Sequence, residues 1–248
     1  MNRQTDRTTA KPKKSKLKIA LTVIASLMLL AGIGVLMFPY ANDFFNDLKT
    51  AADIDHFEET RCDETVVDPH KTYLPELYEA FRQYNENLYK TGQSDLKDPF
   101  SYEKSDFDLS KYGIENNMIG YLKIPKMDLQ ISIRLGASRN NMNYGAVHLS
   151  KTSMPIGGNN TNCVIAAHRG WDGKKMFRYI DKLEAGDDVY LTNSWETLHY
   201  KVSEITKILP NDIKKVLIQK NRDMLTLFTC TPYRINSHRY VVYCDRVV

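Results

Sequence analysis

The stretch "MLTLFTCTPYRINSHRYVVYCDRVV", residues 224–248, carries the strongest structural signal in this chain. Two apolar runs rich in β-branched and aromatic residues, 224–230 and 239–247, flank a polar connection and predict two antiparallel strands. The first run ends on Cys230 and the second begins on Arg239. Antiparallel pairing therefore predicts that the thiol and the guanidinium share one end of a sheet.

Further short β-like runs, separated by turn signals, precede this pair. They are "IGYLKI" (119–124), "LQISIRL" (129–135), "GAVHL" (145–149), "NCVIAAH" (162–168), "DVYL" (188–191) and "TLHYKVSEITKIL" (197–209). Strands at this spacing predict a mainly β domain over residues 119–248, an antiparallel barrel or sandwich rather than alternating βαβ units. The intervening segment 174–183 predicts one short helix at most.

The N-terminus predicts a membrane anchor. A basic tail, residues 1–18, precedes an uncharged apolar stretch of 20 residues, 19–38. As a helix this stretch spans a hydrocarbon core of about 30 Å. It is too long for a cleaved leader, and no cleavage site follows in "PYANDFF", so a retained anchor is favoured. Because basic residues flank its N-terminal end, we expect residues 1–18 in the cytoplasm and the rest outside.

Charge and cysteine content exclude other classes. The formal charge of the whole chain is +4, and the tail alone carries +6, so the remainder carries −2. Nucleic-acid binding by the folded part therefore has no support. The four cysteines match no metal-binding spacing and no dense disulfide framework. Cys163 and Cys244 lie in apolar runs and are expected to be small buried hydrophobes, whereas Cys62 has a polar context.

Between the anchor and the strands, residues 39–70 are expected to form a stalk or loose helix. Residues 71–118 are expected to form a helix and a long loop. Leu77, Phe81, Tyr84 and Leu88 have the spacing of an amphipathic helix, and residues 91–118 after it are expected to form the loop. Loops of this length in compact domains are often lids or binding segments.

His168 ends a third β-like run and completes a reactive set with Cys230 and Arg239. A thiolate attacks acyl carbons, an imidazolium protonates the leaving amine, and arginine stabilises the developing oxyanion. A neighbouring imidazolium or guanidinium is expected to lower the pKa of the thiol. Each residue also has an ordinary structural interpretation, so the residues alone leave a thiol acyltransferase and a membrane-anchored binding module both open.

The surrounding blocks resemble the sortase family. "TLFTCTPYRINSHR" (226–239) is similar to the T-L-x-T-C signature in its class C, pilin-polymerising form, and "GYLKIPKMDLQISI", "GAVHLSKTSMPIGG" and "AAHRG" follow in the family's order. The resemblance covers roughly residues 70–248. It implies a closed barrel of about eight strands, with Cys230 as the nucleophile, His168 as the general acid and Arg239 as the oxyanion or substrate arginine. It also implies that Thr229 lines the groove.

The resemblance further implies a lid. "KDPFSY" (97–102) is similar to the class C lid motif, which implies that Asp98 pairs with Arg239, Pro99 fixes the bend and Phe100 caps Cys230. One departure from the family pattern lies beside the groove, where Arg234 occupies a position that is usually glycine.

The expected activity is cysteine transpeptidation without cofactor or metal. The enzyme would cleave an LPxTG-like sorting signal, hold the acyl group on Cys230 and transfer it to a pilin lysine. The alternatives are a housekeeping sortase that delivers proteins to the peptidoglycan precursor, and a binding module without catalysis.

Overall fold

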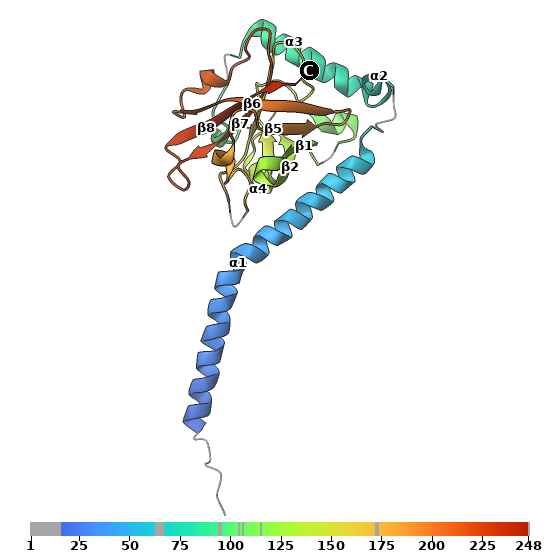
Figure 1. Cartoon of the computed structure of the whole chain (residues 1–248). Helices are drawn as coiled ribbons and strands as arrows, with labels where there is room; N and C mark the ends of the chain where they lie inside the picture. Colours follow the sequence, from blue (N-terminus) through green and yellow to red (C-terminus); the bar gives the residue numbers. More distant parts are fainter. Residues whose placement is uncertain are drawn as a thin grey trace, which may run out of the picture.

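The strands close into a barrel. The structure, a computed structural model, describes residues 16–62, 67–93, 96–103, 105, 107–114, 116–171 and 174–247. Within these residues eight strands follow one another around the barrel in the order β1-β2-β3-β4-β7-β8-β6-β5 (Figure 1). The expectation of a mainly β, closed barrel of about eight strands is confirmed.

The strands lie close to the predicted runs. They are β1 (Met118–Ile124), β2 (Leu129–Leu135), β3 (Ala146–His148), β4 (Thr161–Ala166), β5 (Asp188–Thr192), β6 (Thr197–Ile208), β7 (Asp223–Thr231) and β8 (His238–Arg246). Short helices interrupt the connections: α2 (Pro69–Thr72), α4 (Arg139–Tyr144) and the 3₁₀ turns η1 (Pro99–Ser101), η2 (Leu109–Tyr112), η3 (Pro125–Met127), η4 (Ile180–Lys182) and η5 (Ile213–Val216).

Two strand pairs correct the expected antiparallel arrangement. β7 and β8 pair antiparallel as predicted, but β4 runs parallel to β7 and β3 runs parallel to β2. Parallel neighbours require a long connection, and the segment between β4 and β7, which includes β5 and β6, supplies it. Runs of apolar residues do not distinguish parallel from antiparallel partners, because both directions bury the same side chains.

β7 is buried on both faces. Leu225 and Leu227 belong to one apolar cluster, whereas Met224 and Phe228 belong to a second cluster on the opposite face. Successive side chains of a strand point to opposite faces, so this alternation explains why the run is apolar at nearly every position. The continuous pattern that predicted a strand is therefore the pattern of a central strand covered on both sides.

α3 (Pro75–Thr91) covers the first of these clusters. Leu77, Phe81 and Leu88 of α3 are buried, as the helical spacing predicted, and Leu77 and Phe81 join the cluster that contains Leu225. Pro75 begins the helix, where its missing N–H costs nothing, and Gly92 ends it at a φ of 72°.

α1 (Lys16–Thr60) is a single helix that extends well beyond the expected span 19–38. It is long and apolar enough to cross a membrane, and the apolar side chains of its N-terminal half are exposed. The helix bends partway along its length (Figure 1), and Pro39, which lacks the N–H needed for the helical ladder, lies inside it. The predicted stalk is thus helical as far as Thr60.

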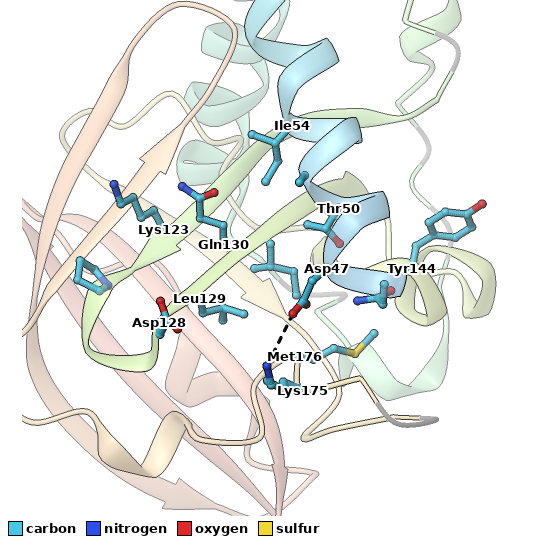
Figure 2. Close-up of a pocket in the computed structure, with 14 residues that line it drawn as sticks. Asp47, Thr50, Ile54, Lys123, Asp128, Leu129, Gln130, Tyr144, Lys175 and Met176 are labelled. Atoms are coloured by element: carbon cyan, nitrogen blue, oxygen red, sulfur yellow. Dashed lines mark ion pairs between the residues drawn. The ribbon is translucent and has the colours of Figure 1, made fainter. Parts of the chain in front are cut away.

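The C-terminal half of α1 packs against the barrel. Asp53 of α1 forms an ion pair of 2.9 Å with Arg134 of β2, and Ile54 and Phe57 pack against Met118 of β1. Nearer the bend, Lys175 forms ion pairs with Asp43 at 2.9 Å and Asp47 at 3.7 Å. Figure 2 shows this junction, where side chains of α1 face β2 and Lys175 across a cavity of about 320 Å³.

A buried histidine gives the barrel an acid-sensitive position. The ring of His148 at the end of β3 is fully buried, and its Nε2–H donates to the Ser153 carbonyl at 2.9 Å. Burial lowers the pKa of His148 from 6.5 to about 4. An unfolded chain therefore binds the proton first as the pH falls from about 6.5 towards 4, and the folded state loses stability over that range.

We predict that His148→Gln removes this part of the acid sensitivity. Between pH 8 and pH 5 the wild type should lose roughly 2 kcal/mol of unfolding free energy that the variant does not lose. Urea titrations of the detergent-solubilised full chain at both pH values measure the difference. The exposed His238→Gln is the matched control, and equal losses in wild type and His148→Gln would contradict the assignment.

Candidate active site

Strand register brings the predicted residues to one place. Cys230 of β7 and Arg239 of β8 are direct cross-strand partners, as are Phe228 and Val241 two positions further along. Such opposed residues project to the same face of a sheet. Phe228 and Val241 belong to the second apolar cluster, so Cys230 and Arg239 lie on the face that this cluster covers.

β4 brings His168 to the same edge. In the parallel register Ala166 is the partner of Phe228, and the ladder continues beyond the strand because the Ala167 N–H donates to the Phe228 carbonyl at 3.2 Å. Two residues further, Arg169 donates to the Thr231 hydroxyl at 2.6 Å. His168 therefore follows the same register and lies beside Cys230.

The three side chains line one cavity of about 570 Å³. His168, Cys230 and Arg239 are each less than 10% exposed, so the reactive groups lie at the bottom of the depression. The remaining lining residues are Phe100, Tyr102, Arg169, Gly170, Trp171, Tyr233, Arg234 and Asn236. No aspartate or glutamate lines the cavity, and three arginines do: Arg169, Arg234 and Arg239. Two of them are paired with carboxylates outside the lining, Arg169 with Asp181 and Arg239 with Asp98.

Asp98 forms an ion pair with Arg239. The Nε–H donates to both oxygens of the carboxylate, at 2.9 Å and 3.2 Å, and Nη2 donates to Oδ2 as well. The side chain of Arg239 is 9% exposed and that of Asp98 is 18% exposed, so the pair is largely shielded from water. The other terminal nitrogen, Nη1, donates to the carbonyls of Asn236 and His238. Arg239 is thus held by both the β7–β8 loop and the segment around Asp98.

Phe100 lies between the imidazole and the guanidinium. Its ring centroid is 5.5 Å from that of His168, and the Cζ of Arg239 lies 5.1 Å from the ring. The 3₁₀ turn at Pro99–Ser101 aims the ring inward, and Asp98 caps this turn by accepting a hydrogen bond from the Phe100 N–H at 3.2 Å. Pro99 is buried. One carboxylate therefore stabilises the turn and binds the arginine.

Thr229 lies elsewhere than the resemblance implied. It is fully buried, it is not among the residues that line the cavity, and its hydroxyl donates to the Ala167 carbonyl at 2.7 Å. Alternation along β7 explains this, because Thr229 must face away from Cys230. Its bond fixes the peptide that directly precedes His168, so it acts on the position of the imidazole.

The electrostatic state differs from the sequence-based expectation of a lowered thiol pKa. Burial raises the pKa of Cys230 to about 11. The positive charge of Arg239 lowers this pKa, and the negative charge of Asp98 raises it, but burial has the largest effect. Burial also lowers the pKa of His168 below its usual value. With Asp98 in place, the resting site therefore holds a neutral thiol and a neutral imidazole at physiological pH.

Several lining residues were not predicted. Trp171 stacks on His168 with ring centroids 4.8 Å apart and an interplanar angle of 21°. Arg169 pairs with Asp181 at 3.0 Å, and Tyr233 lies on the loop after Cys230. Arg169 and Trp171 directly follow the predicted strand end at His168, and this proximity was the available signal. Aromatic and basic residues are common in loops, so the signal was weak.

Comparison with known proteins identifies related sequences and folds. Residues 122–247 match the family described as Sortase domain. Sortase A of Bacillus anthracis is 25% identical over 179 residues, which cover 68% of this chain and 83% of that protein. The solved structure of Sortase C1 of GBS Pilus Island 1 superposes with a TM-score of 0.70 at 31% identity, covering 80% of this chain and 92% of the other. Streptococcus pneumoniae Sortase C gives a TM-score of 0.69 at 35% identity, with coverage of 79% and 97%.

We predict that Asp98→Asn lowers the pKa of Cys230 below about 11. The amide removes the negative charge that raises this pKa and leaves the positive charge of Arg239 unopposed. Each unit of decrease raises the thiolate fraction at pH 8 about tenfold. The measurement is the rate of iodoacetamide alkylation between pH 6 and pH 11. Asp188→Asn, a carboxylate on β5 paired with Lys201, is the control, and superimposable pH profiles for Asp98→Asn and wild type would contradict the prediction.

Proposed function

This chain belongs to the sortase family, whose members are cysteine transpeptidases, and we propose that it joins pilin subunits through their sorting signals. The observation that carries the proposal is the strand register that sets Cys230 opposite Arg239, with His168 beside them in one cavity. Two of the solved structures that it resembles are named for a pilus island and for pilin substrate specificity.

In the first half-reaction, once the segment around Asp98 has moved away, the Cys230 thiol passes its proton to His168. The resulting thiolate attacks the threonine carbonyl of an LPxTG-like signal. The negative oxygen of the tetrahedral intermediate develops beside Arg239, whose guanidinium offers several donors in one plane. The C–N bond to the glycine then breaks, and the His168 imidazolium gives its proton to the leaving amine. The products are a thioester on Cys230, a neutral imidazole and a free amine.

In the second half-reaction a pilin lysine attacks the thioester. Its neutral amine bonds to the acyl carbon and loses a proton to His168, and the sulfur leaves as a thiolate. The result is an isopeptide bond between two subunits, and the thiolate–imidazolium pair is restored. The acceptor is proposed to be a lysine rather than the peptidoglycan precursor because the class C pattern around 97–102 accompanies the pilus-named neighbours.

The segment Asp98–Phe100 is proposed as an autoinhibitory lid. Its carboxylate binds Arg239 and its aromatic ring lies against His168, so it competes with substrate for the same two groups. Opening exposes the cavity and removes the charge that raises the thiol pKa. Only open molecules can bind the sorting signal, so the apparent affinity is reduced by the fraction of molecules that are closed.

The same proposal places the enzyme in a membrane. Residues 19–38 of α1 would cross the bilayer, the tail 1–18 would remain in the cytoplasm, and the barrel would lie outside. Docking of the C-terminal half of α1 against the barrel supports a fixed height of the cavity above the membrane surface.

Incubating the full chain with purified pilin bearing an LPxTG-like signal tests the proposed reaction. Covalent ladders linked through a pilin lysine support pilin polymerisation, whereas product that forms only with a peptidoglycan precursor would indicate the housekeeping alternative. Mass spectrometry of trapped enzyme identifies the residue that carries the acyl group.

We predict that Cys230→Ala abolishes both the thioester and the ladders, because no other described cysteine lines the cavity. Cys163→Ala is the matched control, since this thiol is buried in the core and should leave acylation intact. Acylation that persists in Cys230→Ala would contradict the assigned nucleophile.

We predict that Arg239→Lys loses at least about a hundredfold in kcat/KM. A single ammonium cannot reproduce the planar fork that contacts Asp98 and two backbone carbonyls, and losing one oxyanion donor typically costs a factor of this size. The exposed Arg139→Lys is the control. Turnover within threefold of wild type in Arg239→Lys would remove this arginine from the proposed mechanism.

A further inference from the structure

Two arginines flank a tyrosine at the mouth of the catalytic cavity. The Cζ of Arg178 lies 4.9 Å from the ring centroid of Tyr233, and the Cζ of Arg234 lies 5.3 Å from it. Stacking on an aromatic ring holds a guanidinium by its face and leaves its N–H edge available. We refer to Arg178, Tyr233 and Arg234 as the arginine rim.

The rim is packed against the turn that follows His168. Gly170 in this turn has a φ of 87°, and a Cβ there would lie 3.3 Å from Tyr233 Cε2 and 3.5 Å from Arg178 Cδ. The missing side chain lets the rim approach the turn closely. Tyr233 and Arg234 line the cavity, and Arg178 packs beside Tyr233 against the same turn.

Arg234 is in a backbone conformation that favours glycine. It lies in the β7–β8 loop, where the N–H groups of Ile235 and Asn236 both donate to the Pro232 carbonyl, and its φ is 66°. This region costs free energy for a residue with a Cβ and almost none for glycine. Keeping arginine in a strained position next to a site suggests that the side chain contributes to function.

The charges of the rim differ from those of the other site arginines. Arg239 pairs with Asp98, and Arg169 pairs with Asp181 at 3.0 Å. No carboxylate among the described residues lies within ion-pair distance of Arg178 or Arg234. Both side chains are exposed, and the residues that line the cavity beside them include no acidic side chain. The rim thus presents two positive charges to whatever enters.

We infer that the arginine rim is a subsite for an acidic side chain of the peptide that occupies the cavity. This inference rests on the proposed function and adds a substrate preference to it. Tyr233 and Arg234 line the same cavity as Cys230, so we place the acidic residue within a few residues of the scissile bond. A carboxylate there accepts hydrogen bonds from the guanidinium edges, and no acidic residue lines the cavity to oppose the attraction.

The test compares peptides that differ only in charge. Fluorogenic peptides containing LPETG or LPQTG are assayed with the full chain, and glutamate and glutamine are also exchanged at each residue flanking the motif. The Phe100→Ala background keeps the lid from limiting entry. At one or more positions we expect kcat/KM to be roughly three- to tenfold higher for glutamate, as for an ion pair at a partly exposed site. Raising the salt concentration should reduce this ratio, because it screens exposed charges.

Variants of the rim assign the preference. Arg178→Gln with Arg234→Gln should bring the glutamate-to-glutamine ratio close to one, and Arg234→Glu should favour a lysine peptide over the glutamate peptide. Arg234→Lys should recover part of the ratio, since it keeps the charge without the fork. Lys207→Gln removes an exposed charge from β6 and should leave the ratio unchanged.

The outcomes separate this inference from the proposed function. A ratio near one at every position in the Phe100→Ala enzyme, or a ratio that survives the double glutamine variant, overturns the subsite while thioester formation on Cys230 still stands. Absence of a Cys230 thioester with every peptide overturns the proposed function and the subsite together.

Discussion

The parallel pairing of β4 with β7 is the constraint on which the site depends. Because the two strands run in the same direction, their C-terminal ends meet at one edge of the barrel, and His168 and Cys230 follow the same register. In an antiparallel pair, the end of β4 would lie beside Asp223 at the start of β7. Seven residues of extended strand separate Asp223 from Cys230, a distance of roughly 23 Å, which no side chain can span.

Closure of the barrel also sets the chemical state of the thiol. A guanidinium directly opposite a cysteine is expected to favour the thiolate, yet the pKa of Cys230 is raised to about 11. Burial of the thiol is the largest cause and outweighs the attraction of Arg239, and the negative charge of Asp98 at the same guanidinium adds a further increase. The reactive form of the sulfur and the position of the segment around Asp98 are therefore linked through one ion pair.

The site is supported from several parts of the chain. Thr229 faces away from the cavity and fixes the peptide before His168, and Trp171 stacks on the imidazole from the other side of the turn. The cavity between α1 and β2 is lined by other residues and contains none of the catalytic groups. The contact with α1 and the candidate active site thus use separate surfaces of one barrel.

The sequence by itself determined the strands, the apolar anchor-length stretch and the set of candidate site residues. Local signals suffice for these features, because the alternation of side chains, the turn residues and the T-L-x-T-C block lie within short windows, and the hairpin 224–247 places Cys230 opposite Arg239 through its own connection. Tertiary structure alone decided that β4 lies parallel to β7 and that burial raises the thiol pKa. Each of these features depends on residues more than 60 positions apart in the chain, as His168 and Cys230 are. No local pattern of residues predicts which strand becomes a neighbour or how far the thiol is shielded from water.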